Sequence, residues 1–439
     1  MPHPARSTSA AVLGLPSLVA LIIANMVGAG VFTTSGFALG DLGSADRVMA
    51  AWVVGGVIAL CGALSYGGLV RHITDSGGEY LFLSRIIHPV AGFIAGWVSL
   101  LAGFTGAIAF AARAFETYAF PTRPDWLPSG LAASLMVVAA AILHGVKVET
   151  GAVSQNIVVA VKVVMLVGFL LFSASVGMTQ GLGPAPVTAA PFDFVIFAGS
   201  LVWISLSYSG FNAAVYVAGE AKDAQRNAPR ALWIGTLIVT VLYVALNAAF
   251  VYLPPFEAVV GKEDVAAAAA QAIGGQPAAL AIRFVTVLAL VTSVFSLVMA
   301  GPRVYARMAD DGVFPSFFRF GAAGAPTKAI AAQAVLAVAV IAISDLRGLL
   351  SYLGFTLSLS GALTVAALFV VARREGRKAV AVWGYPFTPA FYVLATLILA
   401  GIAGRRSPME LLTAVVTIAS GSVVYYAFGL HRAASHTAR

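Results

Sequence analysis

The feature that most constrains this chain is a series of apolar segments, each near the length needed to cross a lipid bilayer. About 20 consecutive apolar residues in a helix span the roughly 30 Å of hydrocarbon in a membrane. Twelve such segments follow one another, at 12–40, 48–70, 88–115, 129–146, 151–176, 193–219, 230–254, 279–307, 327–345, 348–372, 387–404 and 409–430. Because lipid offers the backbone no hydrogen-bond partners, such spans are helical. The sequence predicts an all-α integral membrane protein with twelve transmembrane helices.

Composition excludes a soluble protein. Only 10% of the 439 residues are charged and 60% are hydrophobic, whereas soluble domains carry about 25% charged residues. The segments between the spans are short, so we expect residues 1–439 to form a single transmembrane domain. The first span is also longer than the apolar region of a cleavable signal peptide.

The distribution of positive charge predicts how the chain lies in the membrane. With the N-terminus inside, 17 of the 26 Lys and Arg residues fall in cytoplasmic segments and 8 fall outside. This asymmetry follows the positive-inside rule. It accounts for the net charge of +8 without a nucleic-acid partner. We expect a multi-pass protein of the plasma (inner) membrane with both termini in the cytoplasm.

Two of these spans are interrupted at their centres. The first contains "NMVGAGVF" at 25–32, with two glycines that each cost a helix interior about 1 kcal/mol relative to alanine. The sixth contains "SYSGFN" at 207–212, again between apolar stretches. Spans one and six occupy matching positions in two halves of five spans. Such a pair of interruptions is the best sequence indicator of a transporter's binding site.

Backbone that leaves the helix at this depth predicts a particular kind of ligand. Its unpaired N–H and C=O groups are tolerated in a membrane only where they line a cavity or meet a ligand. The N–H groups that begin the outer half of span one attract an anion such as a carboxylate. The carbonyls that end its inner half, with those of span six, attract an ammonium. An α-amino acid carries both groups on one carbon and fits this arrangement.

Six motifs surround these breaks, in this order: "GAGVF" at 28–32, "SGGEYLFLSR" at 76–85, "GFIAGW" at 92–97, "LSYSGFN" at 206–212, "GEAKDAQRNAPRAL" at 219–232 and "RMADDGVFP" at 307–315. They resemble motifs of the amino acid–polyamine–organocation (APC) superfamily, in particular its L-type branch and bacterial relatives. The resemblance implies a LeuT-like fold with discontinuous helices 1 and 6 and transport by alternating access. Two inverted five-helix repeats would cover about 12–176 and 193–372, with two extra helices at about 387–430.

The resemblance also implies a set of binding residues. It assigns the substrate carboxylate to backbone amides near Gly28 and Gly30, and the ammonium to carbonyls near both breaks. The substrate-binding residues are Asn25, Met26, Val27, Gly28, Ala29, Gly30, Leu206, Tyr208, Ser209, Gly210 and Phe211. Many relatives have bulkier aromatic residues in place of Leu206 and Phe211. We therefore expect small to medium neutral amino acids to bind best.

Lys162 is the one basic residue near the middle of a span. An ionisable side chain at such depth is by default a functional hypothesis. In sodium-independent relatives a lysine of span five fills the second sodium site. This implies that the Lys162 ammonium binds carbonyls near Gly28, with Thr292 or Ser293 of span eight nearby. Proton symport and exchange with a permanently charged lysine both remain open.

Three acidic residues are candidates for an inner gate. Asp75 and Glu79 lie in the predicted cytoplasmic connection between spans two and three, and Glu220 ends span six. We expect them to pair with basic residues when the inner side closes. The mammalian light chains of the family join a heavy chain through an extracellular cysteine. The only cysteine here, Cys61, lies in mid-span, so no disulfide-linked heavy chain is expected.

The sequence therefore predicts a sodium-independent secondary transporter of neutral L-amino acids. Apart from Lys162, the middle of the membrane offers no charged group to pair with a charged substrate side chain. The main alternative is an exchanger or exporter of cationic amino acids or polyamines, and a different class is a non-transporting amino-acid sensor. The sequence shows no metal-ligand cluster, nucleophilic triad or phosphate-binding loop, so we expect neither an enzyme nor a cofactor or metal.

Overall fold

The computed structural model describes residues 13–145, 152–181, 191–319 and 326–427. Within these ranges the regular structure is helical, apart from one isolated bridge between Leu13 and Ala221. Positions 12, 146, 151 and 428–430 of the predicted spans lie outside the described residues. The prediction of an all-α protein is confirmed for the part described.

The helices of the first half correspond to predicted spans one to five. In chain order they are α1 (Leu15–Met26), α2 (Ala29–Leu42), α3 (Ala45–His72), α4 (Gly78–Ile86), α5 (Pro89–Val98), the π-helix η1 (Ser99–Gly106), α6 (Ala107–Ala119), α7 (Leu131–Gly145) and α8 (Ala152–Gln180).

The helices of the second half correspond to spans six to twelve. They are α9 (Phe194–Ser207), the 3₁₀ segment η2 (Phe211–Glu220), α10 (Ala224–Tyr252), α11 (Phe256–Val259), α12 (Val265–Asp310), η3 (Ser316–Phe318), α13 (Thr327–Ile343), α14 (Leu346–Glu375), η4 (Arg377–Ala379), α15 (Phe387–Ala403) and α16 (Pro408–Ala427).

The described helices include eight that are long and apolar enough to cross a membrane, or nine if the bent pair α1 and α2 is one span. The other three predicted spans coincide with shorter apolar helices of 10–17 residues, in α7, α13 and α15. The chain is therefore an integral, multi-pass membrane protein. The twelve-span topology with two inverted repeats remains a prediction.

Local sequence explains where several of these helices begin and end. The Asp193 carboxylate accepts hydrogen bonds from the backbone N–H groups of Val195 (2.7 Å) and Ile196 (3.3 Å) at the start of α9. The Asp345 carboxylate accepts one from Gly348 (2.6 Å) at the start of α14. Such caps satisfy N–H groups that have no partner within the helix. Gly43 ends α2 with φ of 61°, a left-handed conformation suited to glycine.

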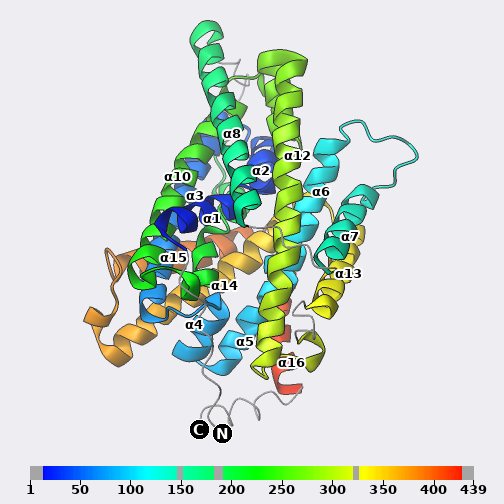
Figure 1. Ribbon diagram of the computed structural model, residues 1–439. Coiled ribbons are helices and arrows are strands. Elements are labelled where there is room, and N and C mark those ends of the chain that lie inside the picture. Colours follow the sequence, from blue (N-terminus) through cyan, green and yellow to red (C-terminus); the bar gives the residue numbers. More distant parts are fainter. Residues whose placement is uncertain (1–12, 146–151, 182–190, 320–325, 428–439) are drawn as a thin grey trace.

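The packing places the two interrupted segments at the centre of the bundle. The α1 helix packs on α10, and α2 packs on α9 and α12. Figure 1 shows α12 extending along the molecule beside α6 and α8, with α7 beside α13 at one edge. Large apolar side chains are exposed on the outer helices, among them Leu135, Ile142, Val164, Leu171 and Val335. Exposed apolar surface on this scale fits contact with lipid.

Candidate functional site

The first break separates α1 from α2 by a bend of 41°. Gly28 lies between them with φ of −129° and ψ of −154°, and its N–H donates to the Met26 carbonyl (2.8 Å). This is extended backbone, which any residue adopts. The backbone angles of Gly28 therefore do not require a glycine. A Cβ at this position would approach only the Met26 carbonyl and the Ser293 hydroxyl, both at 3.9 Å.

The second break follows α9, and here glycine is required. Gly210 has φ of 96°, which side chains other than glycine rarely adopt. A Cβ on Gly210 would also lie 2.9 Å from the Asn25 carbonyl oxygen. The two breaks therefore contact each other directly. Within the second break, the Ser209 N–H donates to the Leu206 carbonyl (2.9 Å).

Two side chains from other helices hold the carbonyls freed by the first break. The Lys162 ammonium, on α8, donates to the Val27 carbonyl (2.9 Å) and its side chain is only 2% exposed. The Tyr243 hydroxyl, on α10, donates to the Met26 carbonyl. With the Gly28 N–H, Tyr243 uses both lone pairs of the Met26 oxygen. The sequence had no signal that singled out Tyr243 for this bond among the mid-span aromatic residues.

The two predicted hydroxyl residues of α12 differ in their surroundings. Ser293 faces the first break, as its contact distance to Gly28 indicates. The Thr292 hydroxyl instead donates to the carbonyls of Leu288 and Ala289 in its own helix, at 2.9 Å each. Ser293 is therefore the hydroxyl with the freer access to the break.

A cavity of about 1260 Å³ surrounds both breaks. Its lining includes every site residue predicted from the sequence except Val27, whose carbonyl is bound by Lys162. Aromatic and hydroxyl side chains such as Phe104, Phe295 and Ser296 complete the wall. The lining continues to exposed residues at one end of the bundle, among them Asp75, Ser76, Gly219 and Glu220. The cavity is therefore open at this end, which we call the inner end.

The acidic residues of the inner end have mixed partners. Asp75 forms an ion pair with Arg85 (2.5 Å). Glu79 instead accepts hydrogen bonds from the Tyr66 hydroxyl (2.5 Å) and the Asn212 amide (3.1 Å). The expected basic partner is thus found for Asp75, whereas Tyr66 and Asn212 are neutral donors to Glu79. Burial raises the pKa of the Glu79 carboxyl, against the opposing effect of the Tyr66 and Asn212 hydrogen bonds.

Glu220 contributes to the inner end through its backbone. Its carbonyl accepts a hydrogen bond from the Leu13 N–H (3.0 Å), and the Lys222 N–H donates to the Leu13 carbonyl (2.9 Å). The Gly219 N–H donates to the Ser76 hydroxyl (3.0 Å). These bonds tie the segment before α1 and the connection after α3 to the end of η2. The inner half of the first broken span is thereby attached to the inner half of the second.

The opposite end, which we call the outer end, is tightly packed. A Cβ on Gly30 would lie 2.7 Å from the Ser207 Cα, so α2 and α9 approach as closely as a glycine permits. One turn further along, the Thr34 and Ser207 hydroxyls are 2.9 Å apart and hydrogen-bonded. The Gly261 N–H donates to the Gly36 carbonyl (2.8 Å), which brings the segment after α11 onto α2. The cavity is therefore accessible from the inner end and closed at the outer end.

Comparisons with known proteins identify the family. The amino acid permease family model matches residues 13–427. The chain belongs to the amino acid permease family. This membership places it in the APC superfamily and makes it a transporter, not an enzyme. Within the described residues, no group of three or more His, Cys, Asp and Glu could hold a metal ion.

Individual relatives match over nearly the whole chain. The chain is 26% identical to b(0,+)-type amino acid transporter 1 of Mus musculus, covering 95% of this chain and 87% of the relative. It is 24% identical to Asc-type amino acid transporter 1 of Mus musculus, covering 94% and 80%. It is 25% identical to the serine/threonine exchanger SteT of Bacillus subtilis, covering 94% and 96%. At this identity the relatives support amino acid transport without fixing the substrate.

Proposed function

We propose that this permease is a sodium-independent secondary transporter of neutral L-amino acids that works by alternating access. The observation that carries the proposal is the cavity around two broken spans, open at one end and packed shut at the other. The names of all three relatives denote transporters or exchangers of amino acids. By the positive-inside rule, the inner end faces the cytoplasm in this proposal.

The unpaired backbone groups of the first break suit the common part of an amino acid. The N–H groups of Ala29, Gly30 and Val31 begin α2 and have no acceptor within that helix. They would bind the substrate carboxylate, aided by the positive end of the helix dipole. The Gly28 N–H is already bonded to Met26. Gly28 would instead provide space, because a glycine has no Cβ between the ligand and the backbone.

The substrate ammonium would bind carbonyls of the facing break. The Met26 and Val27 carbonyls already accept bonds from Tyr243 and Lys162. The Asn25 carbonyl lies against Gly210 and is the better-placed acceptor in the first span. Carbonyls around Tyr208 and Ser209 would supply the remaining acceptors.

The lining near the breaks favours an uncharged substrate side chain. Leu206, Phe104 and Phe295 give it an apolar wall, and the Lys162 ammonium is bound to backbone. One observation favours the alternative of a cationic substrate. Glu79 lies near the second break, because its carboxylate binds Asn212, two residues after Gly210. A substrate ammonium or guanidinium would have to displace the Tyr66 and Asn212 donors from it.

Lys162 supports sodium independence. Its ammonium is bound to a carbonyl that the break sets free, as a sodium ion would be. Transport would then be driven by a proton gradient or by exchange of one amino acid for another. Reconstituted protein in liposomes, loaded with and without internal amino acid, separates the two mechanisms when a pH gradient is applied. Uptake that needs internal amino acid indicates exchange, and uptake driven by the pH gradient indicates proton symport.

A competition panel tests the substrate class. Serine, threonine, alanine and leucine should inhibit uptake more strongly than lysine, arginine, glutamate or a polyamine. A panel led by arginine or a polyamine, with that inhibition lost in Glu79→Gln, would replace the proposal with the cationic alternative. Binding of an amino acid without transport under any gradient would instead indicate a sensor.

A further inference from the structure

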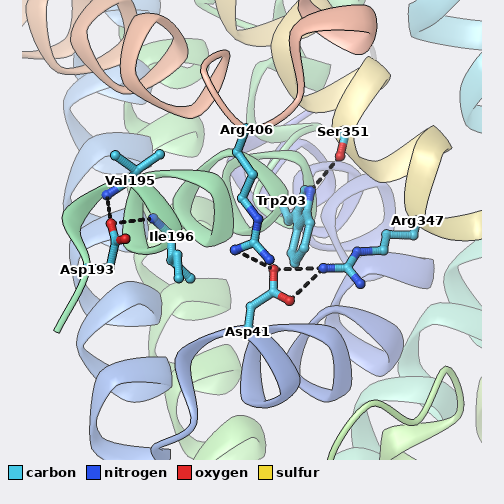
Figure 2. A network of polar contacts seen from close by, with 8 residues as sticks. All are labelled: Asp41, Asp193, Val195, Ile196, Trp203, Arg347, Ser351 and Arg406. Atoms are coloured by element: carbon cyan, nitrogen blue, oxygen red, sulfur yellow. Dashed lines mark hydrogen bonds and ion pairs between the residues drawn. The ribbon is translucent and has the colours of Figure 1, made fainter. Parts of the chain in front are cut away.

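An ionic network joins three elements at the outer end. Asp41, at the end of α2, accepts two hydrogen bonds from Arg347 at the start of α14, at 2.6 and 2.7 Å. Arg406, in the turn between α15 and α16, forms a second ion pair with Asp41 (3.3 Å). Figure 2 shows both guanidinium groups directed at this one carboxylate. The Asp41 side chain is only 11% exposed, against 47% for Arg347.

The same network includes α9, the outer half of the second broken span. The Arg347 guanidinium lies over the Trp203 ring, 4.9 Å from its centroid. The Trp203 indole N–H donates to the Ser351 hydroxyl of α14 (2.7 Å), as Figure 2 also shows. The outer halves of both broken spans are therefore fastened to α14. Hydrogen bonds between charged groups are among the stronger polar interactions, and the cation–π contact adds to them.

The network lies beyond the packed region and not in the cavity. Asp41 follows Gly28 by 13 positions, which corresponds to about 20 Å along a helix. None of Asp41, Trp203, Arg347 and Arg406 lines the large cavity. Between them and the cavity lie the close contacts of Gly30 and Thr34 with Ser207. For the cavity to open at the outer end, α2 and α9 must separate there, and the bonds to α14 must break.

We propose that Asp41, Trp203, Arg347 and Arg406 form an outer-gate latch, which holds the outer end closed while the cavity is open at the inner end. The proposal rests on alternating access in the proposed function. Asp41 is the centre of the latch, because both arginines bind its carboxylate. Releasing Asp41 would leave two arginines on α14 and the α15–α16 turn, with no acidic partner on α2. The latch therefore favours one conformation over the other without contacting the substrate.

A cysteine at Thr34 reports opening of the outer end. Thr34 is fully buried between α2 and α9, between the cavity and the latch. The native Cys61 is first replaced in Cys61→Ser, and Thr34→Cys is introduced in that background. A membrane-impermeant maleimide is then applied to the outer side of intact cells without substrate. The labelling rate measures how often α2 and α9 separate.

Asp41→Asn and Arg347→Gln test the latch from its two sides. Each should raise the labelling rate about tenfold, which corresponds to about 1.4 kcal/mol less preference for the closed outer end. Because both changes remove the ion pair between Asp41 and Arg347, the increase in the double variant should be smaller than the product of the two single increases. Asp46→Asn is the matched control. Asp46 is acidic and at the same end, but it accepts a hydrogen bond from the Tyr252 hydroxyl (2.7 Å) and is not part of the latch, so labelling should stay at the parent rate.

The outcomes separate the latch from the proposed function. An unchanged labelling rate in both Asp41→Asn and Arg347→Gln would overturn the latch, as would an equal increase in Asp46→Asn. If Asp41→Asn does not reach the membrane, Arg347→Gln decides alone, since nearly half of that side chain is exposed. Labelling requires no transport. Faster labelling of the variants, in a protein that transports no amino acid, would support the latch and refute the proposed transport function. Normal transport with an unchanged labelling rate in the variants would support the transport function and refute the latch.

Discussion

Two glycines of the first break, two residues apart, should have different effects when each is replaced by alanine. A Cβ on Gly30 would lie 2.5 to 2.8 Å from three atoms of Ser207, one of them the backbone Cα. A Cβ on Gly28 would meet nothing closer than 3.9 Å. Both glycines line the cavity. Gly30→Ala therefore strains the closed outer end, whereas Gly28→Ala places a methyl group where the substrate carboxylate would bind.

The clash between a Cβ on Gly30 and Ser207 determines how large the effect of Gly30→Ala should be. Inserting one methyl group into a well-packed interface costs about 1 to 3 kcal/mol. Most of this cost falls on the conformation in which α2 is packed on α9, because the methyl group has room once the two helices separate. The equilibrium should therefore shift toward the outward-open form by about 5- to 150-fold, at about 1.4 kcal/mol for each factor of ten. The apparent affinity at each face follows the population of the form open to that face.

Transport in liposomes of one predominant orientation measures both faces. Gly30→Ala should lower KM for substrate on the outer face and raise it on the inner face. Gly28→Ala should raise KM on both faces by a similar factor, since it acts on the ligand in either conformation. If Gly30→Ala also raised KM equally on both faces, contact between α2 and α9 would not control the outer gate. Unchanged KM values in Gly28→Ala would show that the substrate carboxylate does not bind at the first break.

Two further predictions concern the side chains that hold the first break. A sodium ion sharing the Val27 carbonyl would lie about 4 Å from the Lys162 ammonium and be repelled by about 4 kcal/mol at an effective dielectric of 20, or roughly a thousandfold in affinity. Initial uptake by the wild type should therefore be equal in sodium and choline buffers. Lys162→Met should slow transport at least tenfold, whereas the control Lys262→Met should not. A strong sodium requirement in the wild type would show that Lys162 does not substitute for sodium. Tyr243→Phe removes the hydrogen bond to the Met26 carbonyl, worth about 0.5 to 1.5 kcal/mol. It should weaken substrate binding up to about tenfold in a binding titration, whereas Tyr252→Phe should leave binding unchanged. Equal effects of the two changes would mean that the Met26 carbonyl is not part of the site.

The helices and the two breaks were predictable because their causes are local. An apolar run near the length of a membrane crossing determines a helix by itself, and each predicted span coincides with a helix or a broken pair of helices. The two interruptions were visible as glycines inside apolar sequence. At Gly210 the positive φ requires a glycine. Gly28 has extended backbone angles that other residues also adopt, and a sequence does not distinguish these two kinds of glycine.

The resemblance led to the bond between Lys162 and the first break, but other interactions that depend on packing had no signal in the sequence. Asp41 and Arg347 are 306 positions apart, and neither residue lies in a motif around the breaks. The bond from Tyr243 to Met26 joins α10 to α1 over 217 positions. The open inner end is also beyond sequence reasoning. Both conformations of an alternating-access transporter use the same helices, so a sequence pattern that predicts helices does not distinguish one conformation from the other.

Substrate binding and outer closure meet within one helical turn, and this offers a route by which they could be coupled. The proposed carboxylate site uses the first N–H groups of α2, and Gly30 in the same turn packs on Ser207. A ligand changes a conformational equilibrium only by the difference in its affinity for the two forms. A substrate whose carboxylate is bound at Ala29 and Gly30 would have its ammonium held by the second break. Movement of this turn relative to α9 would therefore change the affinity for the substrate. The α-amino and α-carboxyl groups would thus connect the two broken spans, and the substrate itself would complete the closed outer end that the Asp41 latch then holds.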